Sequence, residues 1–186
     1  MTVEEILADA AHKMDKAVDV TREEFATIRT GRATPAILSR VTVDYYGTPT
    51  PLNQLASFSV PEPRLLVIQP FDRNSIAGME KALMQSDLGL TPSNDGQVIR
   101  LAFPQLTEER RKELTKVVHQ RAEEGRVSVR NVRRHAKEEL EKLERAHDIS
   151  EDDLARAEKE LQKRTDEHVG QIDELSKHKE TELMEV

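Results

Sequence analysis

A run of apolar-type positions near the N-terminus, separated alternately by four and three residues, constrains this chain more than any other feature of its sequence. An α-helix has 3.6 residues per turn, so this spacing gathers the positions into one seam along one side of a helix, as in coiled coils and helical bundles. Thr2 and Glu5 have the S/T-x-x-E spacing of a capping box and predict the start of the helix. The seam comprises Leu7, Ala11, Met14, Val18, Thr21, Phe25 and Ile28.

Two longer segments with helical periodicity occupy the C-terminal half. The first begins after Thr107 and continues to Ala146, which is about 40 residues, or roughly 60 Å at 1.5 Å per residue. The second begins at Ser150, which has the spacing of an N-cap with Asp153, and its seam is the weakest of the three because polar residues interrupt it. A helix with a single apolar stripe must bury that stripe, so three such helices predict a three-helix bundle.

The link between the last two helices, residues 147–150, is short. A short link makes the two helices antiparallel neighbours and favours packing within one chain, which predicts a monomer in solution. A parallel coiled-coil oligomer would satisfy the same seams and is the alternative.

The pattern changes between residues 30 and 106, where all eight prolines lie. Alternation of apolar and polar residues around 41–45 and 98–103 and the aliphatic run 65–68 predict strands. Helical spacing returns only around Ile76, Met79 and Leu83. We therefore predict an α+β protein in which an elongated three-helix bundle, residues 1–30 and 105–186, carries a small inserted β/α/β domain, residues 31–104.

The two points at which the chain passes between these predicted domains form a candidate hinge of Gly31, Pro104 and Gln105. Glycine removes the conformational restriction at one crossing, and proline disfavours helix at the residue before it and removes a donor at the other. The alternative is that Gly31 and Pro104 only end the neighbouring helices.

Several classes of protein are excluded by composition. The chain has no cysteine, which excludes disulfides and thiolate metal sites. Charged residues throughout the first twenty positions are incompatible with a signal peptide, and the longest aliphatic run, 65–68, is too short to span a membrane. We expect a soluble cytoplasmic protein.

No catalytic or metal-binding motif is present. The sequence lacks a P-loop and an HExxH motif, and its six histidines are scattered. The acidic run Glu151, Asp152 and Asp153 is sufficiently explained by the positive end of a helix, and Ser150 by its role as a cap. We therefore expect no enzyme activity, no metal and no cofactor.

Positive charge is concentrated in one part of the chain. Residues 110–137 contain 10 Lys and Arg against 3 Asp and Glu, or +7, whereas residues 138–186 contain 8 against 17, or −9. Helical phase places Arg126, Arg130, Arg133 and Lys137 on one line beside the apolar seam, and Lys112 and His119 extend it. No acid occurs between Arg126 and Lys137, so these residues have no acidic partner within their own segment.

Such a line predicts binding to phosphate, and a long rod without a recognition helix or zinc module suits RNA better than duplex DNA. Two alternatives remain open. Acidic residues of the other helices could neutralise the line, which would then be an ordinary solvated face. A helical scaffold or adaptor would also show heptads and charge of this kind.

The chain resembles the bacterial ribosome recycling factors along its whole length. Six ordered blocks carry the resemblance: IRTGRATPAIL at 28–38, VDYYGTPTPLNQLAS at 43–57, DLGLTP at 87–92, LTEERRKEL at 106–114, VSVRNVRR at 127–134 and ISEDD at 149–153. The resemblance implies a three-helix bundle with a small inserted β/α/β domain. It also implies that the protein acts with elongation factor G and GTP to split post-termination ribosomes into subunits, that the bundle binds large-subunit rRNA, and that GTP is used by the elongation factor.

The same resemblance suggests which residues bind rRNA. Arg130 and Arg133, both in VRNVRR, are the first candidates for rRNA binding. Arg126, just before this block, is the third. Arg29 and Arg32 of IRTGR and Arg111 of EERRKEL are further candidates, although some of them could form structural ion pairs. The aromatic residues Tyr45, Tyr46 and Phe58 could stack on bases, but we expect them instead to lie in the core of the small domain.

Overall fold

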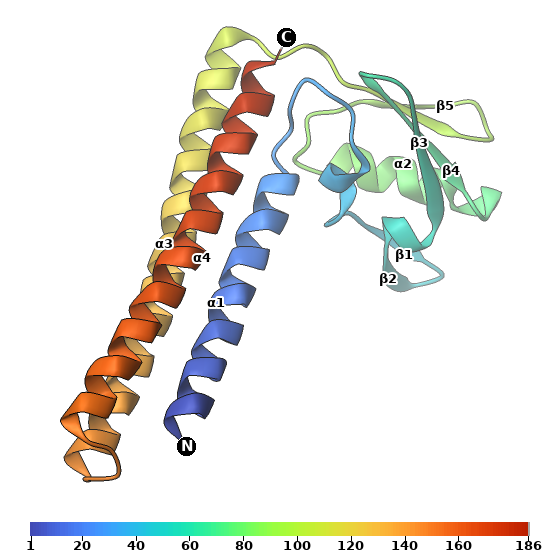
Figure 1. Ribbon diagram of the computed structural model, residues 1–186. Helices are drawn as coiled ribbons and strands as arrows, with labels where there is room; N and C mark the ends of the chain where they lie inside the picture. The colour runs from blue at the N-terminus through green and yellow to red at the C-terminus, as the bar shows by residue number, and fades with distance from the viewer. Residues whose placement is uncertain (186) are drawn as a thin grey trace. The chain divides into compact units, whose positions relative to one another are not determined.

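Three long helices dominate the computed structural model, which describes residues 1–185 (Figure 1). They are α1 (Val3–Ala26), α3 (Glu108–Arg145) and α4 (Glu151–Met184). The chain forms two compact units. The helical unit contains residues 1–25 and 115–181, and the sheet unit contains residues 26–114 and those from 182 onward. The predicted α+β fold, a helical bundle with a small sheet domain inserted after its first helix, is confirmed.

Both predicted helix caps are present. The amide of Thr2 donates to the Glu5 carboxylate at 2.8 Å, and the amide of Glu5 donates to the Thr2 hydroxyl at 3.2 Å. Ser150 and Asp153 form the same reciprocal pair at 3.2 and 3.0 Å at the start of α4. Each pair satisfies backbone donors that a helix N-terminus leaves without partners, which explains why α1 and α4 begin where they do.

The core of the helical unit follows the predicted seams and is wider than they are. Met14, Val129 and Ile172, from the three helices, are fully buried. On α1, Ile6 and Ala10 are buried while the predicted seam residue Ala11 is only half-buried. A helix that packs against two neighbours buries a broader stripe than the narrow seam of a two-stranded coiled coil.

Polar residues interrupt the buried face of α4, as its weak seam predicted. Thr165, His168, Ser176 and Lys179 are all buried. The two ring nitrogens of His168 lie 2.6 Å from the Arg164 carbonyl oxygen and 2.7 Å from the Asp15 carboxylate. His168 therefore joins α4 to α1 through polar contacts within the buried seam.

Gly125 lies where α3 packs tightly against both of its neighbouring helices. A Cβ at this position would collide with the Thr21 hydroxyl of α1 and would lie 3.2 Å from Cδ1 of Ile172 on α4. A glycine is needed here for space and not for a special backbone angle, because it lies inside a regular helix.

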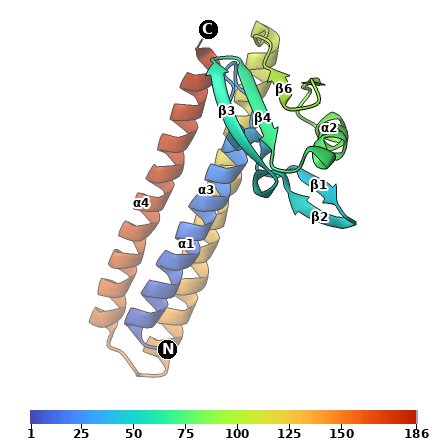
Figure 2. The same ribbon diagram turned by 90° about the vertical axis from the view of Figure 1, so that its right-hand side faces the viewer.

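The sheet unit contains two antiparallel sheets and one α-helix (Figure 2). The hairpin β1 (Thr42–Tyr45) and β2 (Thr48–Pro51) forms the first sheet. The second has the order β3-β4-β6-β5, comprising Ala56–Glu62, Leu65–Pro70, Ile99–Ala102 and Pro92–Asn94. The helix α2 (Ile76–Gln85) packs against β1 and β5, and Leu66, Ile68, Met79 and Ile99 lie in the common core.

Three short 3₁₀ helices, Pro35–Leu38, Leu52–Gln54 and Arg73–Ser75, connect these elements. The predicted strands around 41–45, 65–68 and 98–103 correspond to β1, β4 and β6. The prediction that Tyr46 lies in the core is wrong, because its side chain is 79% exposed in the hairpin turn with φ of 50°. Tyr45 is half-buried, and Phe58 is partly buried against the core.

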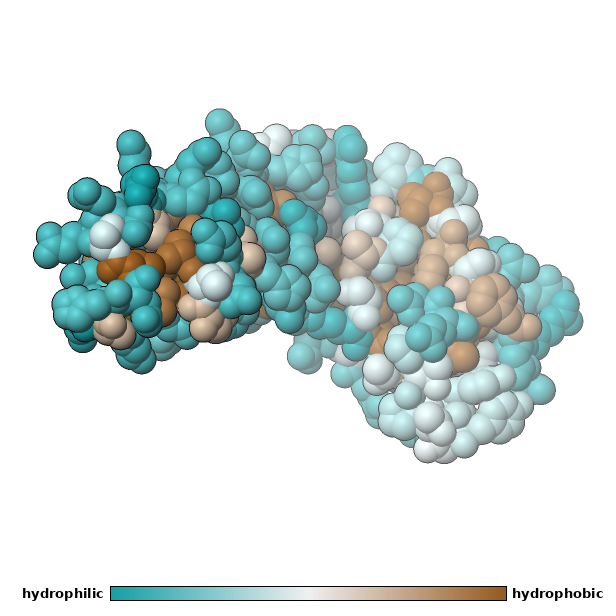
Figure 3. Space-filling model, turned by 60° about the horizontal axis from the view of Figure 1, so that its bottom comes forward, coloured by the Kyte–Doolittle hydropathy of each residue, from teal (hydrophilic) through white to brown (hydrophobic). Residues whose placement is uncertain are grey.

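None of the helices within residues 1–185 is long and apolar enough to cross a membrane. Apolar side chains do gather at one end of the helical unit, where α1 begins and α3 connects to α4 (Figure 3). They line a hollow of about 640 Å³ that includes Met1, Leu7, Leu143 and Ile149. Its charged residues are the acids Glu4, Asp148, Asp153 and Glu160 with the single base Arg156, so this end does not suit a phosphate ligand.

Candidate nucleic-acid interface

Basic residues of α3 form a ladder of polar contacts with α4. His119, Arg126 and Arg133 are seven residues apart on α3, a spacing that keeps them on one side of the helix. His119 pairs with Glu180, Nε of Arg126 lies 2.7 Å from the Asp173 carboxylate, and Nη1 of Arg133 donates to the side-chain oxygen of Gln162 at 2.8 Å. We call these three contacts the α3–α4 ladder. The sequence left open whether acidic residues of other helices neutralise the basic line. The ladder shows that acidic residues of α4 do reach it.

Arg126 is the most neutralised arginine of the line. Besides Asp173 it contacts Glu123 at 3.0 Å, and its side chain is only 24% exposed. Burial lowers the pKa of Arg126, but the hydrogen bonds and charges of Asp173 and Glu123 outweigh burial, so that the pKa is raised. Two carboxylates therefore compete with any phosphate for this guanidinium.

Arg130 is more available. Among the described residues it has a single ion pair, with Glu123, which is long at 3.4 Å, and its side chain is 51% exposed. Glu123 already contacts Arg126 at 3.0 Å, so one carboxylate is shared between two guanidinium groups. An exposed pair of this length contributes little to stability, which leaves Arg130 free to exchange Glu123 for an external anion.

Arg133 differs from both because none of the described carboxylates pairs with it. Its partner Gln162 is neutral, and the amide nitrogen of Gln162 in turn donates to Asp166 at 2.8 Å. Nε of Arg133 is buried and has no hydrogen-bond partner within residues 1–185. The positive charge of Arg133 is thus held in place and is not cancelled by direct pairing.

The basic residues at the two ends of the line are also paired only weakly. Lys112 contacts Glu108 at 3.3 Å and Lys137 contacts Glu141 at 3.9 Å, with exposed basic side chains in both cases.

Arg134, which sequence reasoning passed over, is exposed and makes no hydrogen bond or ion pair with any described residue. The adjacent pair of arginines at 133 and 134 was the signal that could have identified it.

The other three candidate arginines, Arg29, Arg32 and Arg111, belong to the sheet unit. Nη2 of Arg29 donates to the carbonyl oxygen of Pro104 at 2.9 Å, while its Nε is buried without a partner among the described residues. Burial, and then the charge of Arg110, lower the pKa of Arg29. These contacts fasten two segments that are 75 residues apart, so Arg29 has a structural role in the sheet unit.

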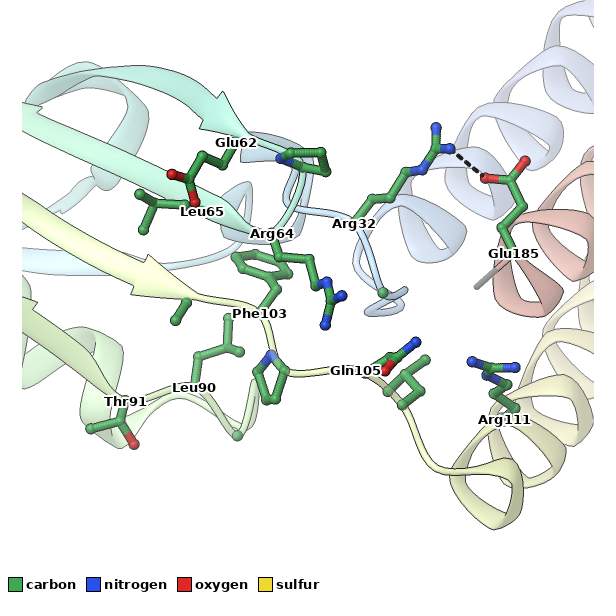
Figure 4. Close-up of a pocket in the computed structure, with 16 residues that line it drawn as sticks. Arg32, Glu62, Arg64, Leu65, Leu90, Thr91, Phe103, Gln105, Arg111 and Glu185 are labelled. Carbon is green, nitrogen blue, oxygen red and sulfur yellow. Dashed lines mark ion pairs between the residues drawn. The ribbon is translucent and has the colours of Figure 1, made fainter.

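Arg32 and Arg111 line a pocket of about 920 Å³ in the sheet unit (Figure 4). Arg32 forms an exposed ion pair with Glu185 at 3.3 Å, and Arg111 is half-buried. Arg64 and Glu62 also line the pocket, whose charged residues are therefore three arginines and two glutamates. The pocket has a mixed lining and is a weaker anion site than the exposed side of α3.

The predicted hinge residues Gly31, Pro104 and Gln105 all line this pocket. A Cβ at Gly31 would meet nothing within 4 Å, and the glycines with positive φ are Gly47, Gly89 and Gly96. The conformation at Gly31 therefore does not itself require glycine. The hinge and the domain boundaries at 31 and 104 stay predictions.

The acidic start of α4 has a structural explanation. The Asp153 carboxylate accepts hydrogen bonds from Ser150 and pairs with Arg156, and these contacts lower the pKa of Asp153. Within residues 1–185, no group of three or more His, Asp or Glu side chains is arranged to hold a metal ion.

Residues 21–184 match the family model described as "Ribosome recycling factor". The ribosome-recycling factor of Thermobifida fusca is 58% identical over 184 residues, covering 99% of this chain and 100% of that protein. The ribosome-recycling factor of Shouchella clausii is 58% identical over 182 residues, covering 98% of each.

Two solved structures are similar over the full chain. A solution structure of a ribosome recycling factor has a TM-score of 0.81 at 44% identity and covers 100% of this chain and 99% of that one. The second, with a TM-score of 0.71 at 47% identity and 100% coverage of both chains, presents models for the T. thermophilus ribosome recycling factor and the E. coli elongation factor G bound to the E. coli post-termination complex.

Proposed function

Since the chain belongs to the ribosome recycling factor family, whose members are translation factors and not enzymes, we propose that it splits post-termination ribosomes into subunits together with elongation factor G and GTP. The similarity to a recycling factor described with elongation factor G on a post-termination complex supports these partners. GTP is bound and hydrolysed by the elongation factor, and the chain itself uses no cofactor. It acts as a monomer in the cytoplasm, where ribosomes are recycled.

The exposed side of α3 binds large-subunit rRNA through phosphate contacts. One observation carries this assignment: Arg133 is fixed by a neutral side chain, so that its charge is not paired with any carboxylate of residues 1–185. Arg130, half-exposed with one long ion pair, is the second contact. Arg126 is a weaker third because Asp173 and Glu123 already occupy it. Arginine suits this task because its planar fork matches phosphate oxygens.

The sheet-unit arginines rank below these. Arg32 is exposed, with an ion pair that an external phosphate could replace. Arg111 is half-buried, and Arg29 is committed to the Pro104 carbonyl. All three are retained as candidate rRNA contacts, with Arg32 first among them.

The inserted domain, residues 31–104, receives force from elongation factor G and transmits it to the bundle, residues 1–30 and 105–186. Gly31, Pro104 and Gln105 form the hinge between them. In this mechanism the bundle is the lever that disrupts the bridges between subunits, and the charged side of α3 is the part that holds it to the large subunit.

A purified splitting reaction tests the proposal. Light scattering should fall when post-termination ribosomes are mixed with this protein, elongation factor G and GTP, and should stay constant when GTP is replaced by a nonhydrolysable analogue. If the complete mixture leaves the fraction of free subunits where it is with elongation factor alone, the proposed function is wrong.

A further inference from the structure

The three rungs of the α3–α4 ladder differ in one chemical respect. His119 and Arg126 face carboxylates of Glu180 and Asp173, whereas Arg133 faces the neutral amide of Gln162. We propose that Gln162 is a positioning residue, which fixes the Arg133 guanidinium for phosphate binding without neutralising it. This inference rests on the proposed function, because it assumes that Arg133 contacts rRNA.

The contacts of Arg133 leave part of its guanidinium available. A guanidinium has five N–H donors. One on Nη1 is used by Gln162 at 2.8 Å, and the one on Nε is buried. The remaining donors, on Nη1 and Nη2, have no acceptor within residues 1–185. They are the donors that can form a fork with two phosphate oxygens.

The orientation of the Gln162 amide is determined by its two neighbours. Arg133 can only donate hydrogen bonds, and the ionised Asp166 carboxylate can only accept them. The amide therefore directs its oxygen to Arg133 at 2.8 Å and its nitrogen to Asp166 at 2.8 Å. Asp166 holds Gln162 in place, and Gln162 keeps the Asp166 carboxylate out of direct contact with Arg133.

A carboxylate at position 162 would act differently. Glutamate has the same length as glutamine and would place a negative charge where the amide oxygen now lies, as Asp173 does opposite Arg126. Phosphate would then have to displace an internal ion pair before it could bind Arg133. The neutral amide gives the same geometric restraint without that competition, which favours Arg133 over Arg126 as the phosphate contact.

Binding of labelled protein to purified large subunits between 50 and 200 mM salt tests this inference. Gln162→Glu should weaken binding roughly tenfold, the effect of one charge-assisted hydrogen bond. The slope of log affinity against log salt should become shallower by about 0.7 to 0.9, the contribution of one phosphate contact. Wild-type affinity and slope for Gln162→Glu would overturn the inference.

A matched control separates local from general charge effects. Gln171→Glu adds the same charge to α4. Gln171 is exposed and lies nine residues after Gln162, which places it about 180° away around the helix. This variant should bind like the wild type. Equal weakening by Gln171→Glu and Gln162→Glu would mean that charge anywhere on α4 repels RNA, and would refute a specific role for Gln162.

A double-mutant cycle with Arg133→Gln completes the design. If Gln162 acts through Arg133, Gln162→Glu should have almost no further effect once Arg133 is replaced, and an undiminished effect would exclude the inference. Normal binding by Arg133→Gln alone would instead contradict the proposed role of Arg133. Weak binding by Arg133→Gln together with normal binding by Gln162→Glu would remove only the role of Gln162.

Discussion

Arg133 in the helical unit and Arg29 in the sheet unit are held in closely similar ways. Each donates one hydrogen bond to a neutral oxygen, at 2.8 and 2.9 Å, and each has a buried Nε without a partner among the described residues. Their acceptors differ. The Pro104 carbonyl belongs to the backbone, so Arg29 fastens one segment of chain to another, whereas Gln162 is a side chain that Asp166 orients.

The comparison extends to the two units. The sheet unit uses charge internally, as in the pair of Arg100 with Asp95 at 2.8 Å across a turn and the contact of Arg29 with Pro104. The helical unit displays charge along α3 and limits how strongly α4 neutralises it. If Arg133 binds rRNA as proposed, the nature of the acceptor, backbone for Arg29 and side chain for Arg133, distinguishes the structural arginine from the binding one.

The largest expected effect is on ribosome binding. Arg133→Glu should weaken large-subunit affinity by about 2–3 kcal/mol, or about 30- to 150-fold, because a phosphate contact is replaced by repulsion. Sedimentation or fluorescence binding measures this, and the helical circular dichroism melt should not change. Arg22→Glu, at an exposed arginine of α1, is the control that should bind normally. Equal binding by the two variants would contradict the distinction between Arg133 and other arginines.

Arg29→Met should lower stability and leave ribosome binding unchanged, the reverse of the effect expected for Arg133→Glu. Loss of the hydrogen bond to Pro104 should destabilise the sheet unit by about 2 kcal/mol while the salt dependence of ribosome binding stays unchanged. The chain has two tyrosines and no tryptophan, and both tyrosines lie in the sheet unit, so tyrosine fluorescence during urea unfolding reports on that unit. A reduced salt slope for Arg29→Met would show that Arg29 is also a phosphate contact.

Gly125→Ala should destabilise the helical unit by about 1–2 kcal/mol, because the collision with Thr21 outweighs the higher helix propensity of alanine. Gly170→Ala is the matched control. A Cβ there meets nothing within 4 Å, so this variant should gain up to about 1 kcal/mol. Thermal melts at the helical circular dichroism band measure both, and identical shifts would show that α3 has room at Gly125.

Tyr46→Asn should stabilise the sheet unit by about 0.5–1 kcal/mol. Asn-Gly is favoured in a two-residue hairpin turn with positive φ, whereas a bulky residue there is strained. Fluorescence of the remaining Tyr45 follows the unfolding. A loss of stability would mean that the contact of the Tyr46 hydroxyl with Asp72 outweighs the strain.

The smallest effect concerns acid stability. Hydrogen bonds from the backbone amides of Val98 and Gln97, followed by Arg100, hold the pKa of Asp95 well below its ordinary value. A depressed folded pKa stabilises the sheet unit above the unfolded pKa of about 3.9, and this contribution is lost as pH falls toward the folded value. Asp95→Asn should therefore flatten the loss of sheet-unit stability below about pH 4 in acid titrations monitored by tyrosine fluorescence. An unchanged profile would rule out this contribution.

The helices were predictable because their signals are local. Heptad spacing located α1, α3 and α4, and the Thr2 and Ser150 caps fixed two of their starts. In the sheet unit, β1 and β6 alternate visibly and β4 begins with a continuous aliphatic run, but β3 has the sequence ASFSVPE and is mostly exposed, so it carries no clear pattern. Family membership, predicted from six sequence blocks, is confirmed, and with it the absence of enzyme activity.

The partners of the arginines were not predictable in the same way. The pairing of Arg126 with Asp173, or of Arg133 with Gln162, depends on the register between α3 and α4, which a single sequence does not specify. Tyr46 was misassigned because residue type alone does not show that the turn points its ring to solvent. Contacts between distant segments, and exposure at turns, required the three-dimensional structure.

The register between α3 and α4 is set at their common end. There the amides of His147 and Asp148 donate to the carbonyls of Glu144 and Leu143, His147 has a positive φ of 59°, and the Ser150 cap follows directly. One residue inserted into the first turn of α4 would turn the rest of that helix by about 100° and shift it by about 1.5 Å relative to this connection. Every pairing along the ladder would then change at once. The connection thus decides which side chain of α4 faces each basic residue of the ladder, and with it how far the charge of α3 is neutralised.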